Sequence, residues 1–269
     1  MIRIRRAAAL AALLFAAIAS GAALAQTRPT HTAAAPGVHS MLWVGNSFFY
    51  YNNSMHNHFG LLVRDAEAGA KSRNVSVTIS GSGLDWHDLA SYFRPGGIGR
   101  YSFVAGNQIR FNPPGKQFDA VLMMDCSQCP IHPQLKEAFY ETVKKDAAIA
   151  RENGALPVLF MSWAYKDKPA MTAELAEAYT RAGNENDALV VPAGLAFARA
   201  IAARPDLEFY QPDKRHPTLI GTYLAAATVY ATLYRKSPVG DPYTAGIDPE
   251  TVKFLQTVAW ETVKAYFGN

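Results

Sequence analysis

The chain has 269 residues, of which 49% are hydrophobic and 18% are charged, with a formal net charge of +4 at pH 7. Its length is sufficient for one domain with a sizeable core. The 26 basic and 22 acidic residues nearly balance, and no long Lys/Arg run occurs. This pattern excludes the electrostatic footprint of a nucleic-acid-binding or polyanion-binding protein.

Residues 1–25 have the pattern of a secretory signal peptide. Three arginines lie in the first six residues, an apolar core follows over 7–19, and Ala23-Leu24-Ala25 fits a cleavage site. The apolar core is short for a membrane span. The predicted cleavage site is not followed by a cysteine, so a lipid anchor is not expected. We therefore expect a periplasmic or secreted protein without a membrane anchor, whose mature chain has a net charge of about +1.

The mature chain is predicted to be a flexible, Thr-, Ala-, Pro- and His-rich lead-in over 26–37, followed by one domain over 38–269. In this domain, apolar β-prone runs alternate with helical patterns. The predicted strands cover 41–44, 75–79, 120–124, 156–162 and 189–191. The predicted helices cover 56–70, 134–153, 172–182, 195–203, 219–234 and 249–266. Thr172 is expected to begin its helix with a capping box.

Strand–helix alternation over five units predicts an α/β protein with a five-stranded parallel sheet and helices on both faces. In such sheets ligands bind beyond the carboxyl ends of the strands. Ser47, the loop Gly81–Gly83 and the segment 125–128 each follow a predicted strand, so we expect them together at this end. The Gly- and Pro-rich segment 94–117 is predicted to be a long loop or small hairpin that shapes specificity.

Three residues suit nucleophilic catalysis. Ser47 follows the apolar run in Gly45-Asn46-Ser47, although a serine here also suits a helix cap. Asp213 precedes His216 by three residues, so its carboxylate can reach one ring nitrogen and leave the other free as a base. Together they predict a Ser-His-Asp triad.

Gly45-Asn46-Ser47 after the first strand, with Asp213-x-x-His216-Pro217 before the last helices, resembles the SGNH (GDSL-type) hydrolase superfamily. The resemblance covers nearly all of the mature chain, with G-N-S in place of the usual G-D-S. It implies a flavodoxin-like three-layer α/β/α sandwich, Ser47 as nucleophile, and His216 and Asp213 as the other triad members.

The resemblance also implies an oxyanion hole. Its donors would be the backbone N–H groups of Ser47 and of Gly81 or Gly83, with Gly81 preferred. The third donor in the superfamily is an asparagine in a G-x-N-D block, which this chain replaces with Met124-Asp125-Cys126-Ser127-Gln128-Cys129. Ser127 or Gln128 is therefore expected to donate instead, and Gln128 is the nearer amide analogue.

Cys126 and Cys129 form a C-x-x-C pair. We interpret them as a local disulfide that stiffens the oxyanion loop, with a thioredoxin-like redox pair as the alternative. Two cysteines are too few for a cysteine-only zinc site. We expect no metal from His56-Asn57-His58 or Asp85-Trp86-His87-Asp88, because alternate histidines on a helix do not face one another.

Side chains beside the predicted triad suggest a substrate cleft. We expect Asn46, Trp86 and His87 to line it. The aromatic run 48–51 is expected to form a platform for an acyl group or sugar, with core packing equally plausible for two of its members.

These observations predict a secreted serine esterase that needs no cofactor. Its substrate is expected to be a small-molecule or carbohydrate ester, with acetyl groups on carbohydrate as the first choice. The alternatives are a non-catalytic carbohydrate-binding protein on an esterase-like scaffold, and a periplasmic thiol-disulfide oxidoreductase that uses Cys126 and Cys129.

Overall fold

The computed structural model describes residues 27–66, 72–112 and 114–268. The predicted signal peptide over 1–25 lies outside these residues, so cleavage and export stay predictions. The end of the helix predicted over 56–70 also lies outside them, and its described part, α2, covers Met55–Ala66. None of the described helices is long and apolar enough to cross a membrane.

The centre of the molecule is a five-stranded sheet whose pairings are all parallel, in the order β2-β1-β5-β6-β7. In chain order the main strands run 2-1-3-4-5, the flavodoxin-like order. The predicted fold class is therefore confirmed. Its strands are β1 (Ser40–Gly45), β2 (Arg73–Thr78), β5 (Ala120–Met123), β6 (Leu156–Phe160) and β7 (Leu189–Val191).

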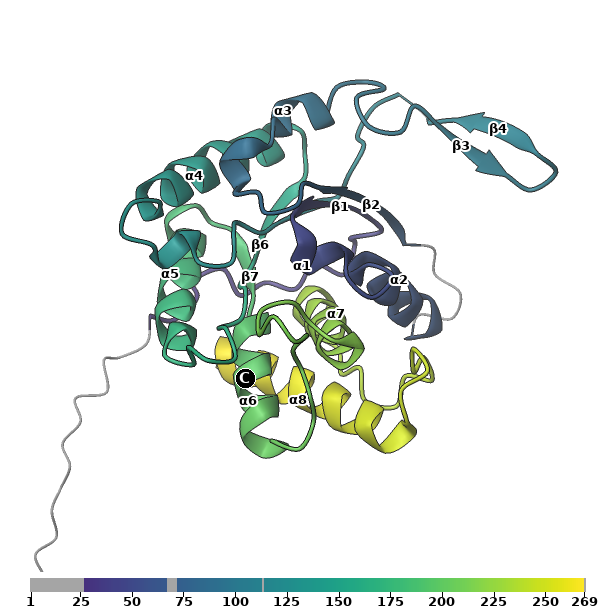
Figure 1. Cartoon of the computed structure of the whole chain (residues 1–269). Coiled ribbons are helices and arrows are strands. Elements are labelled where there is room, and N and C mark those ends of the chain that lie inside the picture. The colour runs from purple at the N-terminus through teal and green to yellow at the C-terminus, as the bar shows by residue number, and fades with distance from the viewer. Residues whose placement is uncertain (1–26, 67–71, 113, 269) are drawn as a thin grey trace, which may run out of the picture.

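Helices cover both faces of the sheet (Figure 1). The chain moves one way along the sheet from β1 to β2 and the other way from β5 to β7. Because crossovers between parallel strands are right-handed, this change of direction places α2 opposite α4 and α5. The remaining bounds are α1 (Ser47–Tyr50), α3 (Leu89–Tyr92), α4 (Lys136–Glu152), α5 (Met171–Glu185), α6 (Ala193–Ala203), α7 (Leu219–Tyr234) and α8 (Pro249–Phe267), with 3₁₀ turns η1 (Leu84–Trp86) and η2 (Cys129–Ile131).

Helix α7 is the most deeply buried helix segment near the predicted site. Every residue from Gly221 to Tyr234 is buried, since α7 packs against α2, α6, α8 and β7. One of its threonines, Thr228, satisfies its hydroxyl by donating to the Leu224 carbonyl at 2.8 Å. The loop that carries His216 ends at the start of α7 and is thereby attached to a rigid support.

The insertion over 94–117 contains an antiparallel hairpin, β3 (Tyr101–Val104) with β4 (Gln108–Phe111). It projects from the body (Figure 1) and leads into the amino end of β5, where Phe93 contacts Phe118 with ring centroids 5.9 Å apart. The predicted hairpin is present. Its expected role in specificity is not supported, because it joins the sheet at the end opposite Ser47.

Two local expectations differ from the structure. The lead-in predicted to be flexible is attached to the domain: Thr30 N donates to Asn184 Oδ1 at 2.8 Å, and Ala35 N donates to the Leu233 carbonyl at 2.7 Å. The capping box at Thr172 is wrong, because α5 begins one residue earlier and Ala170 at its N-cap offers no side-chain acceptor.

Candidate active site

The nucleophile candidate lies at the first residue of α1, directly beyond β1. Asn46 caps this short helix by accepting a hydrogen bond from Phe48 N at 3.2 Å. At Gly45 a Cβ would lie 3.0 Å from Phe49 Cδ2, so the turn needs glycine there to pack Phe49. Ser47 is only 8% exposed. The cap that the sequence suggested for Ser47 is supplied by Asn46 instead, so Ser47 is the first residue of the helix.

The base and the acid share a tight loop between α6 and α7. Asp213 Oδ1 accepts hydrogen bonds from the backbone N–H groups of Arg215 and His216, each at 3.0 Å. Asp213 Oδ2 accepts from His216 Nδ1. One carboxylate therefore fixes both the loop backbone and the imidazole ring. Since a carboxylate only accepts, Nδ1 carries a proton and Nε2 is left as the free base nitrogen.

The three predicted side chains form one hydrogen-bonded chain. His216 Nε2 lies 2.7 Å from Ser47 Oγ across 169 residues of sequence. Partial burial alone would raise the pKa of Asp213, but the hydrogen bonds from the His216 ring and the two backbone N–H groups lower that pKa to about 2. Asp213 is therefore ionised wherever His216 acts as a base.

Asn46 joins the three loops at the carboxyl end of the sheet. Its Nδ2 donates to the carbonyl of Ser82 at 3.0 Å and to the carbonyl of Asp125 at 3.2 Å. Leu84 N in turn donates to Asp125 Oδ1 at 3.0 Å. The structure thus brings the three elements together as expected. Asn46 itself is only 4% exposed and supports the site by linking the loops beneath it. We had expected it to line the cleft.

Gly81 and Gly83 are each required for a different structural reason. Gly81 has φ +73°, and a Cβ there would meet open space. At Gly83 a Cβ would lie 2.5 Å from Asp85 Oδ1 and 2.8 Å from Asp125 Oδ1. Gly83 is therefore needed for packing and Gly81 for its left-handed backbone. Within the described residues, no acceptor is found for the backbone N–H of Ser47 or of Gly81.

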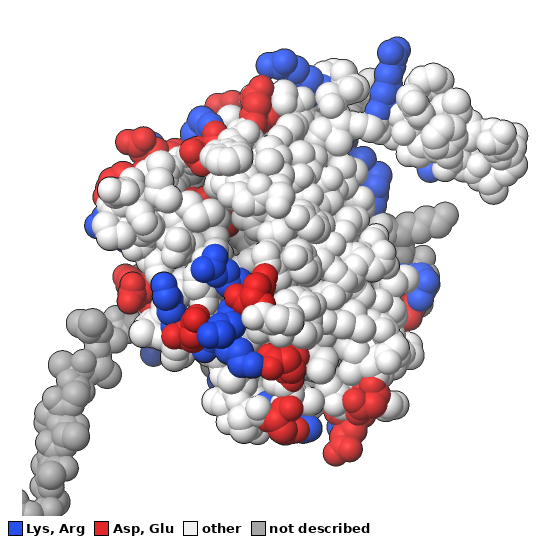
Figure 2. All heavy atoms as spheres, in the orientation of Figure 1, with Lys and Arg blue, Asp and Glu red and all other residues white. Residues whose placement is uncertain are grey.

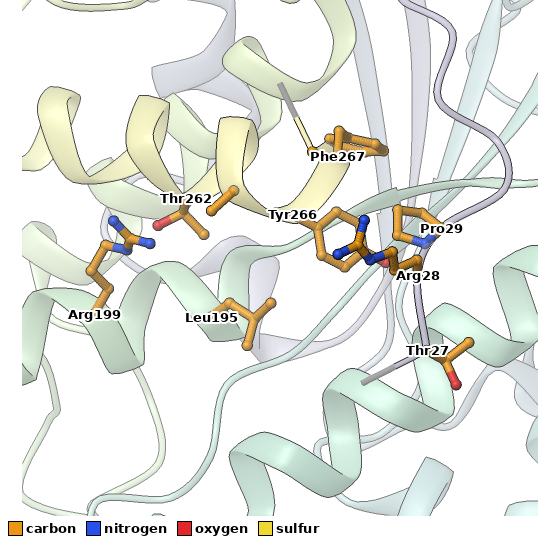
Figure 3. Close-up of a pocket in the computed structure, with 10 residues that line it drawn as sticks. Thr27, Arg28, Pro29, Leu195, Arg199, Thr262, Tyr266 and Phe267 are labelled. Atoms are coloured by element: carbon orange, nitrogen blue, oxygen red, sulfur yellow. The ribbon is translucent and has the colours of Figure 1, made fainter. Parts of the chain in front are cut away.

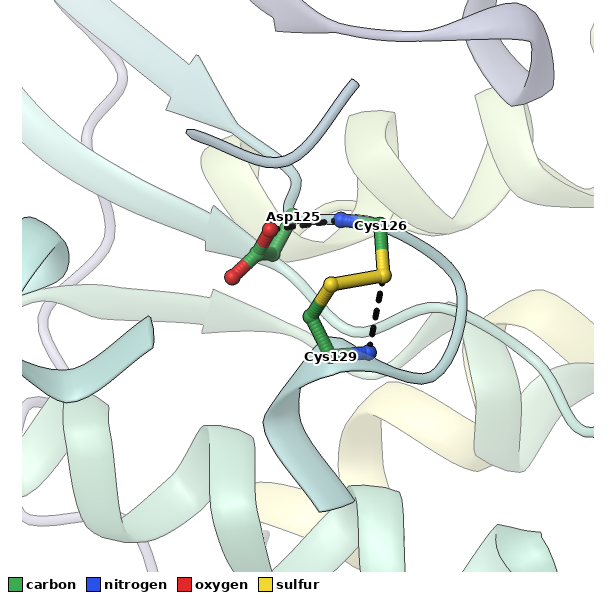
Figure 4. Close-up of side chains that lie close together, drawn as sticks. All are labelled: Asp125, Cys126 and Cys129. Carbon is green, nitrogen blue, oxygen red and sulfur yellow. Dashed lines mark hydrogen bonds between the residues drawn. A yellow bond between two sulfur atoms is a disulfide. The ribbon is translucent and has the colours of Figure 1, made fainter. Parts of the chain in front are cut away.

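The third loop is held by a disulfide between Cys126 and Cys129 (Figure 4). Asp125 lies beside the disulfide, and burial raises its pKa to about 6 despite hydrogen bonds from Cys126 N and Leu84 N. The two sulfurs are bonded to each other, so they offer no thiolate for a metal or for redox attack in this state.

Ser127 and Gln128 have different surroundings. Ser127 Oγ is paired with Tyr165 Oη at 2.6 Å. The half-buried Gln128 amide has no hydrogen-bond partner among residues 27–66, 72–112 and 114–268. Of the two predicted substitutes for the missing asparagine, Gln128 is thus the one whose side chain is unpaired among the described residues.

Trp86 and His87 point to different environments. Trp86 is 62% exposed. His87 is buried beneath the loop, with Nε2 3.2 Å from Ser82 Oγ and Nδ1 3.1 Å from Tyr92 Oη, and burial lowers its pKa. The structure therefore places His87 in the support of the glycine loop, although we had expected it in the cleft.

The aromatic run after Ser47 divides between core and surface. Phe48 and Phe49 are buried, whereas Tyr50 is 38% exposed, which agrees with core packing for two of the four. Phe48 stacks on Trp163 at 4.7 Å, and Trp163 Nε1 donates to the Arg215 carbonyl at 2.9 Å. Trp163 was missed by the sequence prediction, although its position just beyond β6 was a usable signal.

Other surface features lie apart from the triad. A cavity of about 560 Å³ lies between the segment that begins at Thr27 and helices α6 and α8; Arg28, Arg199 and Tyr266 are among its lining residues, and no triad residue is (Figure 3). On the face in Figure 2, acidic and basic side chains are interspersed around a broad uncharged area.

Comparison with known proteins places the fold. The chain matches no protein-family model and no curated protein sequence. It is similar in structure to a DUF4886 family protein from Bacteroides uniformis (TM-score 0.57, 19% identity, 85% of this chain and 95% of that chain). It is also similar to a candidate SGNH hydrolase from Slackia heliotrinireducens (TM-score 0.54, 22% identity, 75% of this chain and 100% of that chain). A third similar structure is Axe2, an acetylxylan esterase from Geobacillus stearothermophilus (TM-score 0.52, 14% identity, 75% of this chain and 96% of that chain). The chain thus has the fold of the SGNH hydrolases.

Proposed function

We propose that this chain is a serine esterase of the SGNH type that hydrolyses carboxylic esters outside the cytoplasm. The observation that carries the proposal is the continuous hydrogen-bonded chain Ser47–His216–Asp213 at the carboxyl end of the sheet. The SGNH-hydrolase fold supports it. The leader pattern over 1–25 supports the location.

Acylation begins when His216 Nε2 takes the Ser47 hydroxyl proton and Ser47 Oγ bonds to the ester carbonyl carbon. The tetrahedral intermediate collapses as the C–O bond to the alcohol breaks, and His216 returns the proton to the leaving alcohol. Water then attacks the acyl carbon while His216 takes up its proton. The second tetrahedral intermediate collapses as the bond to Ser47 Oγ breaks, His216 returns the proton to Ser47, and the acid product leaves. Asp213 stays ionised and holds the ring throughout.

The developing oxyanion would be bound by the N–H groups of Ser47 and Gly81. Both lack an acceptor among the described residues, and Gly81 is exposed. We assign the third donor to the side chain of Gln128 in place of the missing asparagine. Loss of one oxyanion donor typically costs about 10²- to 10³-fold in rate, so Gln128 would have a measurable share of kcat.

We propose a small acyl group on a carbohydrate or other small alcohol as the substrate class. The exposed rings of Trp86, in the 3₁₀ turn η1, and of Tyr50, at the end of the short helix α1 that begins at Ser47, support a sugar-stacking surface. The described acetylxylan esterase shares the fold. Every step above uses side chains, backbone N–H groups and water, so no cofactor is invoked.

Replacement of Ser47 tests the proposal. Ser47→Ala should abolish hydrolysis of p-nitrophenyl acetate and of acetylated xylo-oligosaccharide while the melting temperature stays nearly unchanged. Ser237→Ala, which removes an exposed hydroxyl elsewhere, serves as the control. Full activity in the Ser47→Ala protein would refute the assignment.

A further inference from the structure

The segment after α1 adopts an unusual backbone. Asn52, Asn53 and Ser54 all have positive φ values, of 52°, 65° and 66°. A run of three non-glycine residues in the left-handed region is costly and persists only where the surroundings hold it. Such strain is often found at functional sites, and this segment lies between the nucleophile turn and the His216 loop.

Asn52 connects three parts of the molecule. Its Nδ2 donates to the Pro217 carbonyl at 2.9 Å and to Thr222 Oγ1 at 2.8 Å. Its own carbonyl accepts from His58 Nε2 at 2.7 Å, and His58 Nδ1 lies 2.7 Å from Tyr243 Oη. Pro217, the residue next to His216, is therefore tied to the segment that follows helix α1.

Tyr51 lies directly against the catalytic imidazole. The rings of Tyr51 and His216 are stacked, with centroids 4.3 Å apart and an interplanar angle of 12°. Phe48 contacts the same imidazole at 5.4 Å with an interplanar angle of 73°. The face of an aromatic ring carries partial negative charge and attracts a cation placed over it.

We propose that Tyr51 and Asn52 form a clamp that positions His216 and stabilises its protonated form. When Ser47 gives up its proton, the positive charge that appears on the imidazole lies over the Tyr51 ring. Asn52 fixes the position of the Tyr51 ring relative to the His216 loop through its hydrogen bond to the Pro217 carbonyl. Both are positioning residues that act through His216, and their kinetic role rests on the proposed esterase function.

Two substitutions of Tyr51 distinguish the electrostatic effect of its aromatic face from the effect of apolar packing alone. Tyr51→Phe keeps the aromatic face, whereas Tyr51→Leu keeps only an apolar side chain. Tyr51→Leu should lower the plateau of kcat/KM by about 2- to 30-fold and move the midpoint of the acid limb to lower pH by about 0.4 to 1.5. Tyr51→Phe should retain both values.

Tyr101→Leu is the matched control. Tyr101 is 48% exposed on the hairpin β3–β4, and its ring contacts Phe103 and Phe111. Its substitution should leave both the plateau of kcat/KM and the midpoint unchanged. A Tyr51→Leu protein that is folded and keeps the wild-type midpoint and rate would overturn the proposal.

The role of Asn52 is tested by substitution with glycine. Glycine adopts a positive φ without a steric penalty, so the substitution removes the side chain without adding backbone strain. Asn52→Gly should lower kcat by about tenfold with little change in KM. Asn53→Gly changes the neighbouring left-handed residue without removing a bond to the His216 loop, and should keep wild-type kcat. Equal, wild-type kcat in both variants would contradict the role of Asn52.

An NMR titration of His216 distinguishes this inference from the proposed function. The imidazole Cε1–H resonance reports protonation in the resting protein without any substrate. If Tyr51→Leu lowers the titration midpoint while no ester is hydrolysed, the clamp stands and the esterase proposal fails. If the wild type hydrolyses esters and the titration midpoint is the same in both proteins, the clamp fails alone.

Discussion

At the scale of single residues, Asp213 does two things with one carboxylate. Oδ1 holds the backbone of the loop and Oδ2 holds the ring of His216. The hydrogen bonds that it accepts lower its pKa to about 2. The negative charge that orients the His216 ring is therefore present well below neutral pH.

We predict that kcat/KM falls with a slope of one as pH decreases and His216 takes up a single proton. Asp213→Asn should lower kcat by about 10²- to 10⁴-fold, because an amide can hold the wrong tautomer of His216. Steady-state kinetics from pH 4 to 9 measure both effects. A flat profile, or an Asn variant with wild-type kcat, would exclude this role for Asp213.

The meeting of Ser47, His216 and Asp213 was predictable from two patterns: a serine directly after a strand, and an aspartate three residues before a histidine. The orientation of neighbouring side chains was not. Asn46 and His87 were expected in the cleft, but both are buried. Asn46 donates to carbonyls 36 and 79 residues away, and His87 pairs with Ser82 and Tyr92, each five residues away. Spacing along a chain does not reveal such partners.

At the scale of elements, the hairpin β3–β4 has one apolar face and no layer beneath it. Tyr101, Phe103, Ile109 and Phe111 alternate along the paired strands, so they share a face, and each is at least 48% exposed. The hairpin extends from the amino end of β5 (Figure 1). It is therefore separated from the triad by the length of the sheet.

Replacement of residues 101–111 by a short Gly-Ser linker should leave kcat/KM for a small soluble ester within about twofold of the wild type. The reason is that no residue of this segment contacts the triad or the glycine loop among the described residues. A drop of tenfold or more in a folded variant would show that the hairpin acts at the active site after all.

Continuous apolar runs with clear ends were predicted most accurately. The bounds of α7 and β7 match the expectation, because an apolar run of definite length leaves little choice of register. The start of α5 was mispredicted, because Thr172 resembles a cap in sequence while the helix begins at Met171. The attachment of residues 27–37 could not be seen either, since their partners lie some 150 residues away.

At the scale of the whole molecule, a buried carboxylate opposes folding near neutral pH. Asp146 on α4 is fully buried, and neither of its oxygens has a hydrogen-bond partner among the described residues. Lys145 Nζ lies 3.6 Å from Oδ1. Burial raises the pKa of Asp146 to about 6, above the value of about 3.9 expected in an unfolded chain.

Because the folded state binds this proton more tightly, Asp146 reduces the free energy of unfolding as pH rises from about 4 to 6, and the full penalty persists above that. Asp146→Asn should therefore raise the free energy of unfolding by about 2 kcal/mol more at pH 8 than at pH 4.5, and the gain in melting temperature should be correspondingly larger at pH 8. Glu141→Gln, at an exposed position of α4, is the control. A stabilisation that does not depend on pH would contradict this explanation.

The most direct test of the account is labelling of the full chain with a fluorophosphonate probe, followed by mass-spectrometric mapping of the adduct. An activated serine attacks such a probe, whereas an ordinary hydroxyl does not. We predict a single adduct at Ser47 that is lost in His216→Ala. A folded protein that remains unlabelled, or is labelled at another residue, would contradict the triad and favour a non-catalytic binding protein on this scaffold.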